Sequence, residues 1–351
     1  MKIIFKRTTP TYRNQLTTQQ VMLYLTATLV VVSLFSVGYY FTLGADYGIK
    51  ALLMIIASVV AAYLCEAGYF YLLKEKDIKK AVNNSFPYVT AILFALILPI
   101  GTPYYVVVFG SIFSILIGKL LFGGFGQNIF NPALIGRVFV MMSYGDKLTA
   151  VLPEKAVDGV ASATPTTIMS MGSWMGDSNI SLANLYLGFY KGSIGETFAV
   201  VIIIAGVFLA MKKVLDWRLP VFYIGTAFVI AFIAGMTHGL SPLHFALVHI
   251  GIGGLVFGGI FMLTDPVTSP VDPFGKILFA VGAAFFTMLL RFRSNMPEGV
   301  LYSILIMNML TPMIDKYTVK PTNKDESRKL IMVIAAMLVC SLLIALVWKG
   351  A

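Results

Sequence analysis

The stretch VMLYLTATLVVVSLFSVGYYFTL, residues 21–43, carries no charged side chain along its whole length. A helix needs about 20 such residues to cross a bilayer. The apolar runs of this chain are continuous rather than alternating, which indicates helices and not the strands of a barrel. The 351 residues are 58% hydrophobic and only 12% charged, with a mean hydropathy of +0.85, more apolar than a soluble core requires. The sequence therefore predicts an all-α integral membrane protein.

Apolar runs continue through the rest of the chain, and several are too short for a complete crossing. Short runs are typical of half-spans or re-entrant segments that are buried within a membrane protein. We therefore expect ten or eleven crossings. The eleven candidate runs are 21–43, 48–73, 86–98, 104–121, 129–144, 193–211, 221–236, 245–263, 275–290, 297–310 and 330–348.

The net charge of +10 comes from cations in the short segments between the apolar runs, so it predicts topology and not a nucleic-acid partner. Alternating crossings place four basic groups on one side, which the positive-inside rule assigns to the cytoplasm. The N-terminus is then cytoplasmic, the loop 145–192 is extracytoplasmic, and the protein is a multi-pass component of the cell membrane. Arg291 and Arg293 fall on the outer side and count against this scheme. The four groups are Lys2, Lys6, Arg7 and Arg13; Lys74, Lys76, Lys79 and Lys80; Lys212, Lys213 and Arg218; and Lys316, Lys320, Lys324, Arg328 and Lys329.

A faint internal repeat links the two parts of the chain. FALILPIGTP, residues 94–103, and FMLTDPVTSP, residues 261–270, each end an apolar run with two prolines four residues apart. The first exits outward and the second inward, as expected of two inverted repeats with broken helices at the membrane midplane. The predicted organisation is an N-terminal segment 1–20, a first membrane repeat 21–144, an extracytoplasmic loop 145–192, a second repeat 193–311, a cytoplasmic loop 312–329 and a C-terminal helix 330–351.

The loop 145–192 contains the polar stretch DGVASATPTT, residues 158–167. A solvated turn or a serine- and threonine-rich linker would explain it. One feature favours a modification site instead. Thr164 precedes Pro165, which restricts it to extended backbone and presents its hydroxyl for covalent chemistry.

The stretch DGVASAT resembles the flavinylation motif of the RnfD and NqrB family, Asp-Gly-x-[Ser/Thr]-Gly-Ala-Thr. In that family a flavin transferase joins FMN through its phosphate to the last threonine. Two positions depart from the motif, each by exchange of one small residue for another: Ala161 and Ser162. The matching positions are Asp158, Gly159, Ala163 and Thr164, with Thr166 and Thr167 as alternative acceptors that the motif does not favour.

Further stretches are similar to the same family and extend the resemblance over nearly the whole chain. They are FGGFGQNIFNPALIGRVFV (122–140), GGIFMLTDPVTSP (258–270) and RSNMPEGVLYSILIMNMLTPMID (293–315). The resemblance implies a subunit of the Rnf complex, a translocase that couples ferredoxin:NAD+ oxidoreduction to pumping of Na+ or H+. It also implies a fold similar to urea and ammonium transporters. The NqrB-type subunit of a Na+-pumping NADH:quinone oxidoreductase is the alternative, but NqrB-type chains carry a longer polar N-terminal extension.

The resemblance implies cofactors and partners as well. FMN would be bound covalently at Thr164, with Asp158, Gly159, Ser162 and Ala163 shaping the loop for the transferase. A second, non-covalent flavin, riboflavin or FMN, would lie near the cytoplasmic ends of the helices. The partners would be other Rnf subunits, the flavin transferase, membrane lipid and the pumped ion. Two rival functions are a channel or transporter for a small solute and a structural subunit that anchors redox partners.

Carboxylates at membrane depth are costly, so they are candidates for the ion path. For Glu66 a hydrogen-bonded structural role is an equal alternative; for Asp265 a turn role is favoured, and for Glu298 a helix-capping role. Arg137 is expected to pair with one of these acids or to extend toward the cytoplasm. The glycines of GGFGQN (123–128) lack a nucleotide-loop lysine, so we expect them to allow close helix packing.

Overall fold

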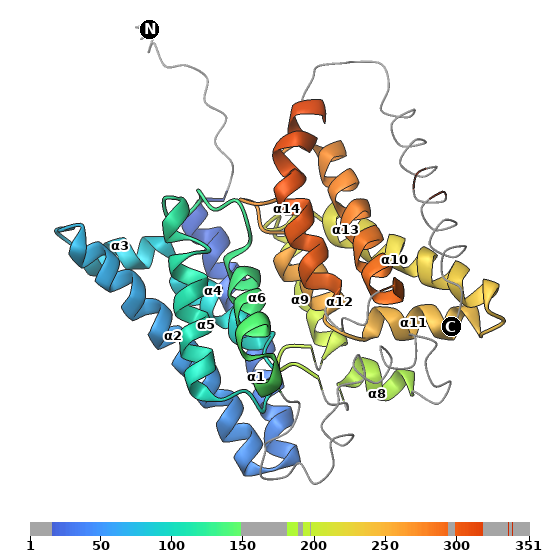
Figure 1. Cartoon of the computed structure of the whole chain (residues 1–351), viewed down its shortest axis with the longest axis horizontal. Helices are drawn as coiled ribbons and strands as arrows, with labels where there is room; N and C mark the ends of the chain where they lie inside the picture. Colours follow the sequence, from blue (N-terminus) through green and yellow to red (C-terminus); the bar gives the residue numbers. More distant parts are fainter. Residues whose placement is uncertain are drawn as a thin grey trace, which may run out of the picture.

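The computed structural model describes residues 16–148, 181–188, 192–196, 198–293 and 299–318, together with the isolated positions 336 and 339. All regular elements in these ranges are helices, accompanied by one isolated bridge between Pro99 and Ser193. We call residues 16–148 the first half and residues 181–318 the second half. Figure 1 shows the first half, blue to green, on the left and the second half, yellow to red, on the right.

The first half begins with a long helix whose N-terminus is closed by a capping box. The Thr17 hydroxyl accepts from the Gln20 backbone N–H, and the Gln20 side chain accepts from the Thr17 N–H, which satisfies two exposed donors. α2 packs against α1, α4 and α5, and α5 packs against α6. The elements are α1 Thr18–Leu43, α2 Ala45–Leu72, α3 Ile78–Ser85, α4 Pro87–Leu96, α5 Tyr104–Leu116, η1 Leu120–Phe122, α6 Pro132–Tyr144 and η2 Gly145–Lys147.

The second half is built around α10 and α13, which pack along each other. α11 also packs on α10, and α14 packs on α13. The two halves meet where α1 contacts α9 and where α6 contacts α14. The elements are α8 Leu182–Leu187, α9 Ala199–Met211, α10 Arg218–Thr237, α11 Pro242–Gly251, α12 Leu255–Phe257, the π-helix η5 Gly258–Met262, α13 Pro273–Arg293 and α14 Gly299–Thr318.

Each predicted apolar run within the described residues forms a helix, but the run 245–263 is not a single helix as its pattern suggested. α11 and the α12–η5 segment meet at a bend of 65°. Ile252 is extended, and Gly253 and Gly254 have φ of 69° and 66°, a left-handed conformation that favours glycine. The run 330–348 lies outside the described residues except for positions 336 and 339.

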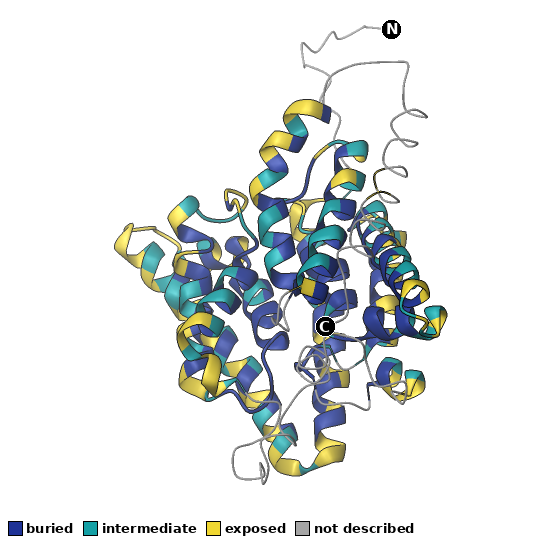
Figure 2. Ribbon diagram, turned by 45° about the vertical axis from the view of Figure 1, so that its right-hand side comes forward, coloured by how far each residue is buried: buried dark blue, intermediate teal, exposed yellow. Residues whose placement is uncertain are grey.

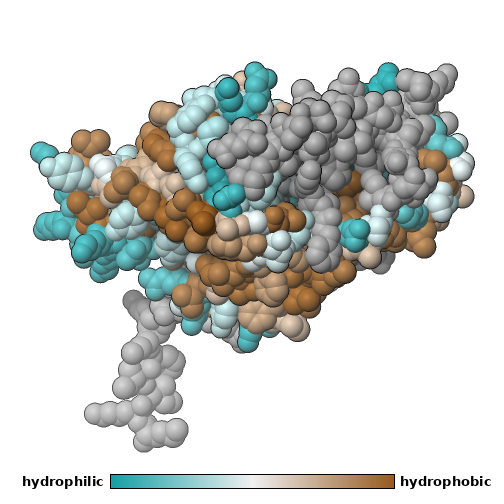
Figure 3. All heavy atoms as spheres, turned by 90° about the horizontal axis from the view of Figure 1, so that it is seen from below, coloured by the Kyte–Doolittle hydropathy of each residue, from teal (hydrophilic) through white to brown (hydrophobic). Residues whose placement is uncertain are grey.

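The surface of the described chain is unusually apolar. Figure 2 shows exposed residues along the outward faces of the helices, and Figure 3 shows broad hydrophobic areas from below. Exposed apolar side chains include Leu23, Leu34, Phe35, Leu64 and Leu72. Among the described residues, five helices are long and apolar enough to cross a membrane, or six with the bent α11–η5 pair. Apolar area on this scale suits contact with lipid, so the protein is an all-α, multi-pass membrane protein.

Helices end in both halves where turns continue through the interior, and each break is hydrogen-bonded by the other half. After α4, the carbonyls of Leu96 and Leu98 accept from Gly195 and Ile194 N–H at 2.6 and 3.0 Å. After η5, the carbonyl of Met262 accepts from the Asn131 side-chain amide at 3.4 Å. Backbone groups freed inside a membrane protein need such internal partners. The two breaks therefore hold the halves together.

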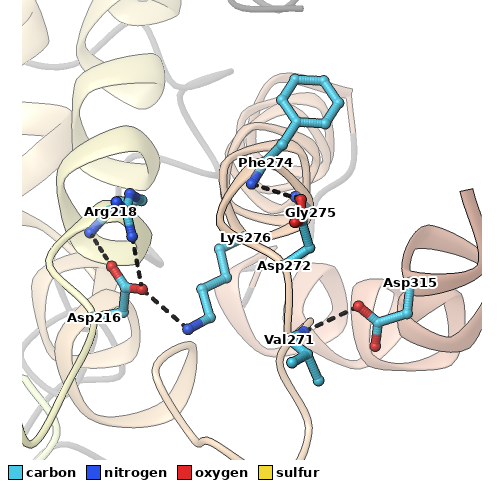
Figure 4. Close-up of polar contacts among 8 residues, drawn as sticks. All are labelled: Asp216, Arg218, Val271, Asp272, Phe274, Gly275, Lys276 and Asp315. Carbon is cyan, nitrogen blue, oxygen red and sulfur yellow. Dashed lines mark hydrogen bonds and ion pairs between the residues drawn. The ribbon is translucent and has the colours of Figure 1, made fainter. Parts of the chain in front are cut away.

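One end of the molecule carries the loops rich in lysine, and we call it the basic end. There the α9–α10 turn is joined to α13, because Asp216 accepts from Lys276 Nζ at 3.0 Å and from the Arg218 guanidinium at 3.3 Å (Figure 4). Burial tends to raise the pKa of Asp216, but the hydrogen bonds from Lys276 and from the Arg218 backbone outweigh it and hold that pKa below its ordinary value. The opposite end, where α6 leads into η2 and α8 begins, is called the central-loop end.

Two further aspartates at the basic end fix the chain that leads into α13. Asp272 accepts from the backbone N–H groups of Phe274 and Gly275 at 2.9 and 3.2 Å, which caps the helix. Asp315 on α14 accepts from Val271 N–H at 3.0 Å (Figure 4). The segment between η5 and α13 is thereby tied to α14.

The glycines of GGFGQN do not serve close helix packing, so that expectation is wrong. Gly123, Gly124 and Gly126 have φ of 112°, 95° and 84°, and they form a turn that L side chains adopt only with strain. Close packing occurs between α5 and α6 instead. A Cβ atom on Gly136 would lie 2.8 Å from the Gly110 carbonyl oxygen, so these two glycines let the helix backbones approach each other.

Candidate functional site

The residues expected to carry the covalent flavin, Asp158, Gly159, Ser162, Ala163 and Thr164, lie outside the described residues, as does Glu298. The described residues that flank the loop lie at the central-loop end. On one side η2 ends at Lys147. On the other side the Tyr40 hydroxyl of α1 donates to the Gly192 carbonyl at 3.2 Å. The loop therefore leaves and re-enters the helical body at the same end.

A cavity of about 80 Å³ lies at the basic end between the two halves, and we call it the basic-end cavity. Its walls come from the start of α1, the start of α4, the turn 119–132, the end of α9 and the corner after η5. The wall residues used below are Phe86, Lys119, Phe125, Asn128, Asn131, Thr264 and Asp265. Polar side chains from both halves thus converge in one otherwise apolar space.

Asp265 forms the corner that follows the π-helix. Its Oδ1 accepts from Val267 N–H at 3.1 Å, which is an Asx turn, so the predicted turn role is confirmed. The Asn128 side chain from the first half lies beside this carboxyl group in the cavity wall. The role in the turn and the place in the cavity wall are compatible, because only one carboxylate oxygen is used by the turn.

Asn131 connects three elements beside this cavity. Its side-chain oxygen caps α6 by accepting from Ala133 N–H at 3.1 Å, while its amide nitrogen donates to Met262 at the break after η5. Its backbone N–H donates to the Asn308 side chain of α14 at 3.2 Å. The Asn308 amide in turn donates to the carbonyl of Thr268 at 3.4 Å. This amide network fixes the polar wall of the cavity.

Glu66, an ion-path candidate, is fully buried in α2 and forms an ion pair with Lys119. The Glu66 Oε1 to Lys119 Nζ distance is 2.6 Å, and the two side chains are 0% and 3% exposed. Lys119 also donates to the carbonyl of Ser85 at the end of α3. Oε2 of Glu66 has no hydrogen-bond partner within the described part of the chain. Lys119 lines the basic-end cavity, so it links Glu66 to the same space as Asp265.

Arg137 lies in the wall of a different cavity, of about 210 Å³, at the central-loop end, which we call the central-loop cavity. Arg137 is 4% exposed, so it does not extend to the basic end as expected of a snorkelling side chain. Glu196 lies in the wall of the same cavity. The sequence pattern did not indicate Glu196, Lys119, Asn128, Thr264 or Asn308. Lys119 is the one whose position, within a predicted apolar run, offered a signal.

The comparisons with known proteins agree on a family. Residues 6–324 match the NQR2, RnfD, RnfE family. A similar protein is the subunit designated D in the proton-translocating ferredoxin:NAD(+) oxidoreductase complex of Clostridium ljungdahlii, 38% identical over 284 residues that cover 78% of this chain and 84% of the relative. The subunit designated D in the Na(+)-translocating ferredoxin:NAD(+) oxidoreductase complex of Acetobacterium woodii is 36% identical over 277 residues, with 78% and 83% covered.

A second group of relatives carries another name. The subunit designated B in the Na(+)-translocating NADH-quinone reductase of Ectopseudomonas mendocina is 33% identical over 273 residues, which cover 76% of this chain and 67% of the relative. Both groups match most of the chain, and the family match includes the break residues and the Asn-Pro-Ala helix start. This chain belongs to the NQR2, RnfD, RnfE family of membrane proteins.

Proposed function

We propose that this chain is the flavin-carrying membrane subunit of an ion-pumping complex that links ferredoxin and NAD+, with FMN joined through its phosphate to Thr164. Its membership of the family, together with the DGVASAT stretch at residues 158–164, carries the proposal. Higher identity to the two relatives from ferredoxin-linked complexes than to the relative from the quinone reductase favours the ferredoxin-linked complex. The NqrB-type subunit of a Na+-pumping NADH:quinone oxidoreductase remains the alternative.

The proposed fold has about ten crossings in two inverted repeats, as in urea and ammonium transporters. Two observations support it, one from helix packing and one from the order of the elements. α2 packs with α5, and α5 with α6; likewise α10 packs with α13, and α13 with α14. In addition, a short helix precedes each break, α3 before α4 and α11 before α12–η5. Broken helices of this kind place binding sites between repeats, where the basic-end cavity lies.

The second flavin, riboflavin or FMN, is proposed to bind in the basic-end cavity. The wall offers an amide from Asn128, a hydroxyl from Thr264 and a carboxyl from Asp265, a donor and acceptor set that suits the polar edge of a flavin ring. Phe86 and Phe125, with ring centres 5.3 Å apart, offer aromatic contact. The cavity of about 80 Å³ is small, so these two aromatic side chains would separate to admit the ring.

In this proposal a bound flavin supplies one-electron and two-electron transfer, and the protein positions it. Asn128 and Asp265 would orient the non-covalent ring. Glu66 and Asp265 are the described candidates for the Na+ or H+ path, and Glu298 is a third. The basic end would face the cytoplasm of the cell membrane, with the flavin loop outside. Other Rnf subunits, the flavin transferase and membrane lipid would be the partners.

The attachment site is tested by the intact mass of the full chain, co-expressed with a flavin transferase. We expect the mass increment of one FMN and a fluorescent band on a denaturing gel. Thr164→Ala should abolish both, whereas the matched control Thr166→Ala should retain both. A colourless, unmodified chain under these conditions would contradict the proposal and favour a channel or transporter for a small solute.

The second flavin is tested by acid precipitation, which releases non-covalent but not covalent flavin. We expect Asn128→Ala and Asp265→Asn to reduce the released flavin at least tenfold. Asp272→Asn, which alters an aspartate outside the cavity, serves as the control. Equal release from all variants would rule out this cavity as the binding site and leave the Thr164 assignment unaffected.

A further inference from the structure

The central-loop cavity opens between the two ends of the loop that contains Thr164. Gly145 and Leu148, which precede the loop, lie on its wall, and so do Ser193 and Glu196, which follow it. At about 3.3 Å per extended residue, the chain on either side of Thr164 is long enough for a group attached there to reach the cavity. The cavity is therefore accessible to whatever the loop carries.

The size and lining of this cavity suit a flat ring system. Its volume of about 210 Å³ is below the ~300 Å³ at which cavities hold whole drug-sized ligands. The space therefore suits a ring system and not a complete nucleotide, whose sugar alcohol and phosphate would remain outside. Most of the wall is apolar and comes from α6, α12, η5 and α14: Leu134, Met141, Phe257, Met262, Val300 and Leu301.

The cavity also contains a buried cation. Arg137 projects from α6, is 4% exposed and contributes to the wall. Charge at membrane depth is costly, so a guanidinium in such a place is a candidate for function. Its planar donors match the carbonyl-rich edge of a ring better than an ammonium would. Glu196 lies in the same wall, where a Cβ on Gly254 would be 2.5 Å from its Oε1.

We propose that the central-loop cavity binds the isoalloxazine ring of the flavin attached at Thr164, and that Arg137 is the residue that positions this ring and raises its reduction potential. The inference rests on the proposed function. A fixed positive charge near the pyrimidine carbonyls of a flavin stabilises the negative charge of its reduced form, which shifts the equilibrium toward reduction. Arg137 is thus a positioning residue that acts on the ring through charge and hydrogen bonds.

Gly145 offers a variant that fills the cavity without straining the chain. It has φ −51° and ψ −43°, and no heavy atom of the described residues lies within 4 Å of the place where its Cβ would be. Gly145→Phe should therefore place an aromatic ring in the entrance and exclude the flavin ring. Gly225→Phe is the matched control, because Gly225 in α10 is also helical and exposed, with open space around its Cβ position in the part of the chain that is described.

The test uses the full chain with its covalent FMN, and Thr164→Ala supplies the background for subtraction. Redox titration followed by flavin absorbance gives the midpoint potential, and iodide quenching of flavin fluorescence gives the accessibility of the ring. We expect Arg137→Gln to reduce the ratio of reduced to oxidised flavin at least tenfold, or about 30 mV for a two-electron couple. Arg137→Lys should restore part of this shift.

Gly145→Phe should lower the potential similarly and increase iodide quenching several-fold, while Gly225→Phe should leave both values unchanged. If Gly145→Phe and Arg137→Gln retain the native potential and quenching in a chain that carries FMN, the ring lies elsewhere and the inference is wrong, although the proposed function stands. If the intact mass shows no FMN, the proposed function fails, and this inference fails with it. Should Arg137→Gln not fold, Gly145→Phe decides alone.

Discussion

Two buried cations occupy comparable places at opposite ends of the molecule. Lys119 follows α5 and donates to the carbonyl of Ser85, at the end of the short helix α3. Arg291, near the end of α13, donates to the carbonyl of Ile252 at 2.7 Å, just beyond the short helix α11. Both short helices directly precede a broken helix. The difference is that Lys119 also pairs with the carboxylate of Glu66, whereas Arg291 contacts the carbonyls of several residues around the α11 terminus.

The shared part of this comparison is a cation at a helix C-terminus, where carbonyls lack partners and the helix dipole is negative. The fold therefore uses a positive side chain to stabilise the end of the short helix that precedes each broken helix. The carboxylate of Glu66 adds a titratable group to this arrangement in the first half. That addition is consistent with an ion-path role for Glu66 beyond a structural one.

Replacement of Lys119 should have the largest effect on the stability of the fold. Lys119→Met removes the ammonium and leaves Glu66 buried without its counter-charge, which should lower the free energy of unfolding by about 3–5 kcal/mol. Thermal and denaturant unfolding in detergent would measure the loss. The double variant Lys119→Met with Glu66→Met should recover most of it, because both charges are then gone. A double variant as unstable as the single one would contradict the ion-pair account.

Arg291→Met tests the other cation. Carbonyls around the end of α11 would lose their donor, and each buried unsatisfied group costs about 1–3 kcal/mol. We expect a total loss of about 3 kcal/mol, with faster hydrogen exchange in residues 242–254. Arg291→Lys should restore part of the stability. Unchanged exchange in α11 would show that Arg291 does not stabilise this helix end.

Glu66→Gln tests whether the carboxylate that pairs with Lys119 has a role in ion transport as well as in stability. Glutamine keeps an acceptor for Lys119 but removes the negative charge, so we expect a stability loss of about 2 kcal/mol, as for a hydrogen bond to a charged group. Ion transport by the assembled complex in vesicles is measured in parallel. A transport loss of tenfold or more at a temperature where the variant is folded would support an ion-path role. Transport at the native rate would leave Glu66 a structural residue.

Asp216 forms a charged contact that is only partly buried, so its replacement should affect stability less than replacement of the buried cations. The pKa of Asp216 is lower in the folded chain than the ordinary 3.8, so its carboxylate stabilises the fold above that pH, and the contribution disappears as the pH falls through the folded value. Asp216→Asn should cost only about 1 kcal/mol at pH 7. Unfolding curves at pH 7 and near pH 3 should differ less for the variant than for the native chain. An equal difference would assign the acid sensitivity to other groups.

Helix positions were predictable because continuous apolar runs determine membrane helices almost by length alone. The positions of the helix breaks were less predictable. The bend at Ile252–Gly254 lies inside one apolar run, and only the adjacent glycines hinted that a helix could not continue there. The short polar helix α3 was missed because its sequence, IKKAVNNS, resembles a loop.

The basic-end cavity was only partly predictable. Asp265 was recognised because an acid next to an apolar run is conspicuous. Its neighbour Asn128 was not, because the two residues belong to different halves and no periodic pattern relates them. Lys119 and Glu66 are likewise 53 positions apart and meet only through the packing of α2 on α5. Residue type indicates which groups need partners, while the partner itself is decided by tertiary contacts.

The π-helix η5 makes the corner at Thr264 and Asp265 tolerant of a change in chain length. Its wide turn, closed by the hydrogen bond from Leu263 N–H to the Gly258 carbonyl at 2.8 Å, contains one more residue than an α-helical turn. Loss of one residue from 258–262 would return this turn to ordinary α-helical winding and change the direction of the following corner only slightly, because the wide turn already absorbs its extra residue. The acid would still face its amide neighbours. The wide turn is therefore the place where this segment can lose one codon without turning Asp265 away from the cavity.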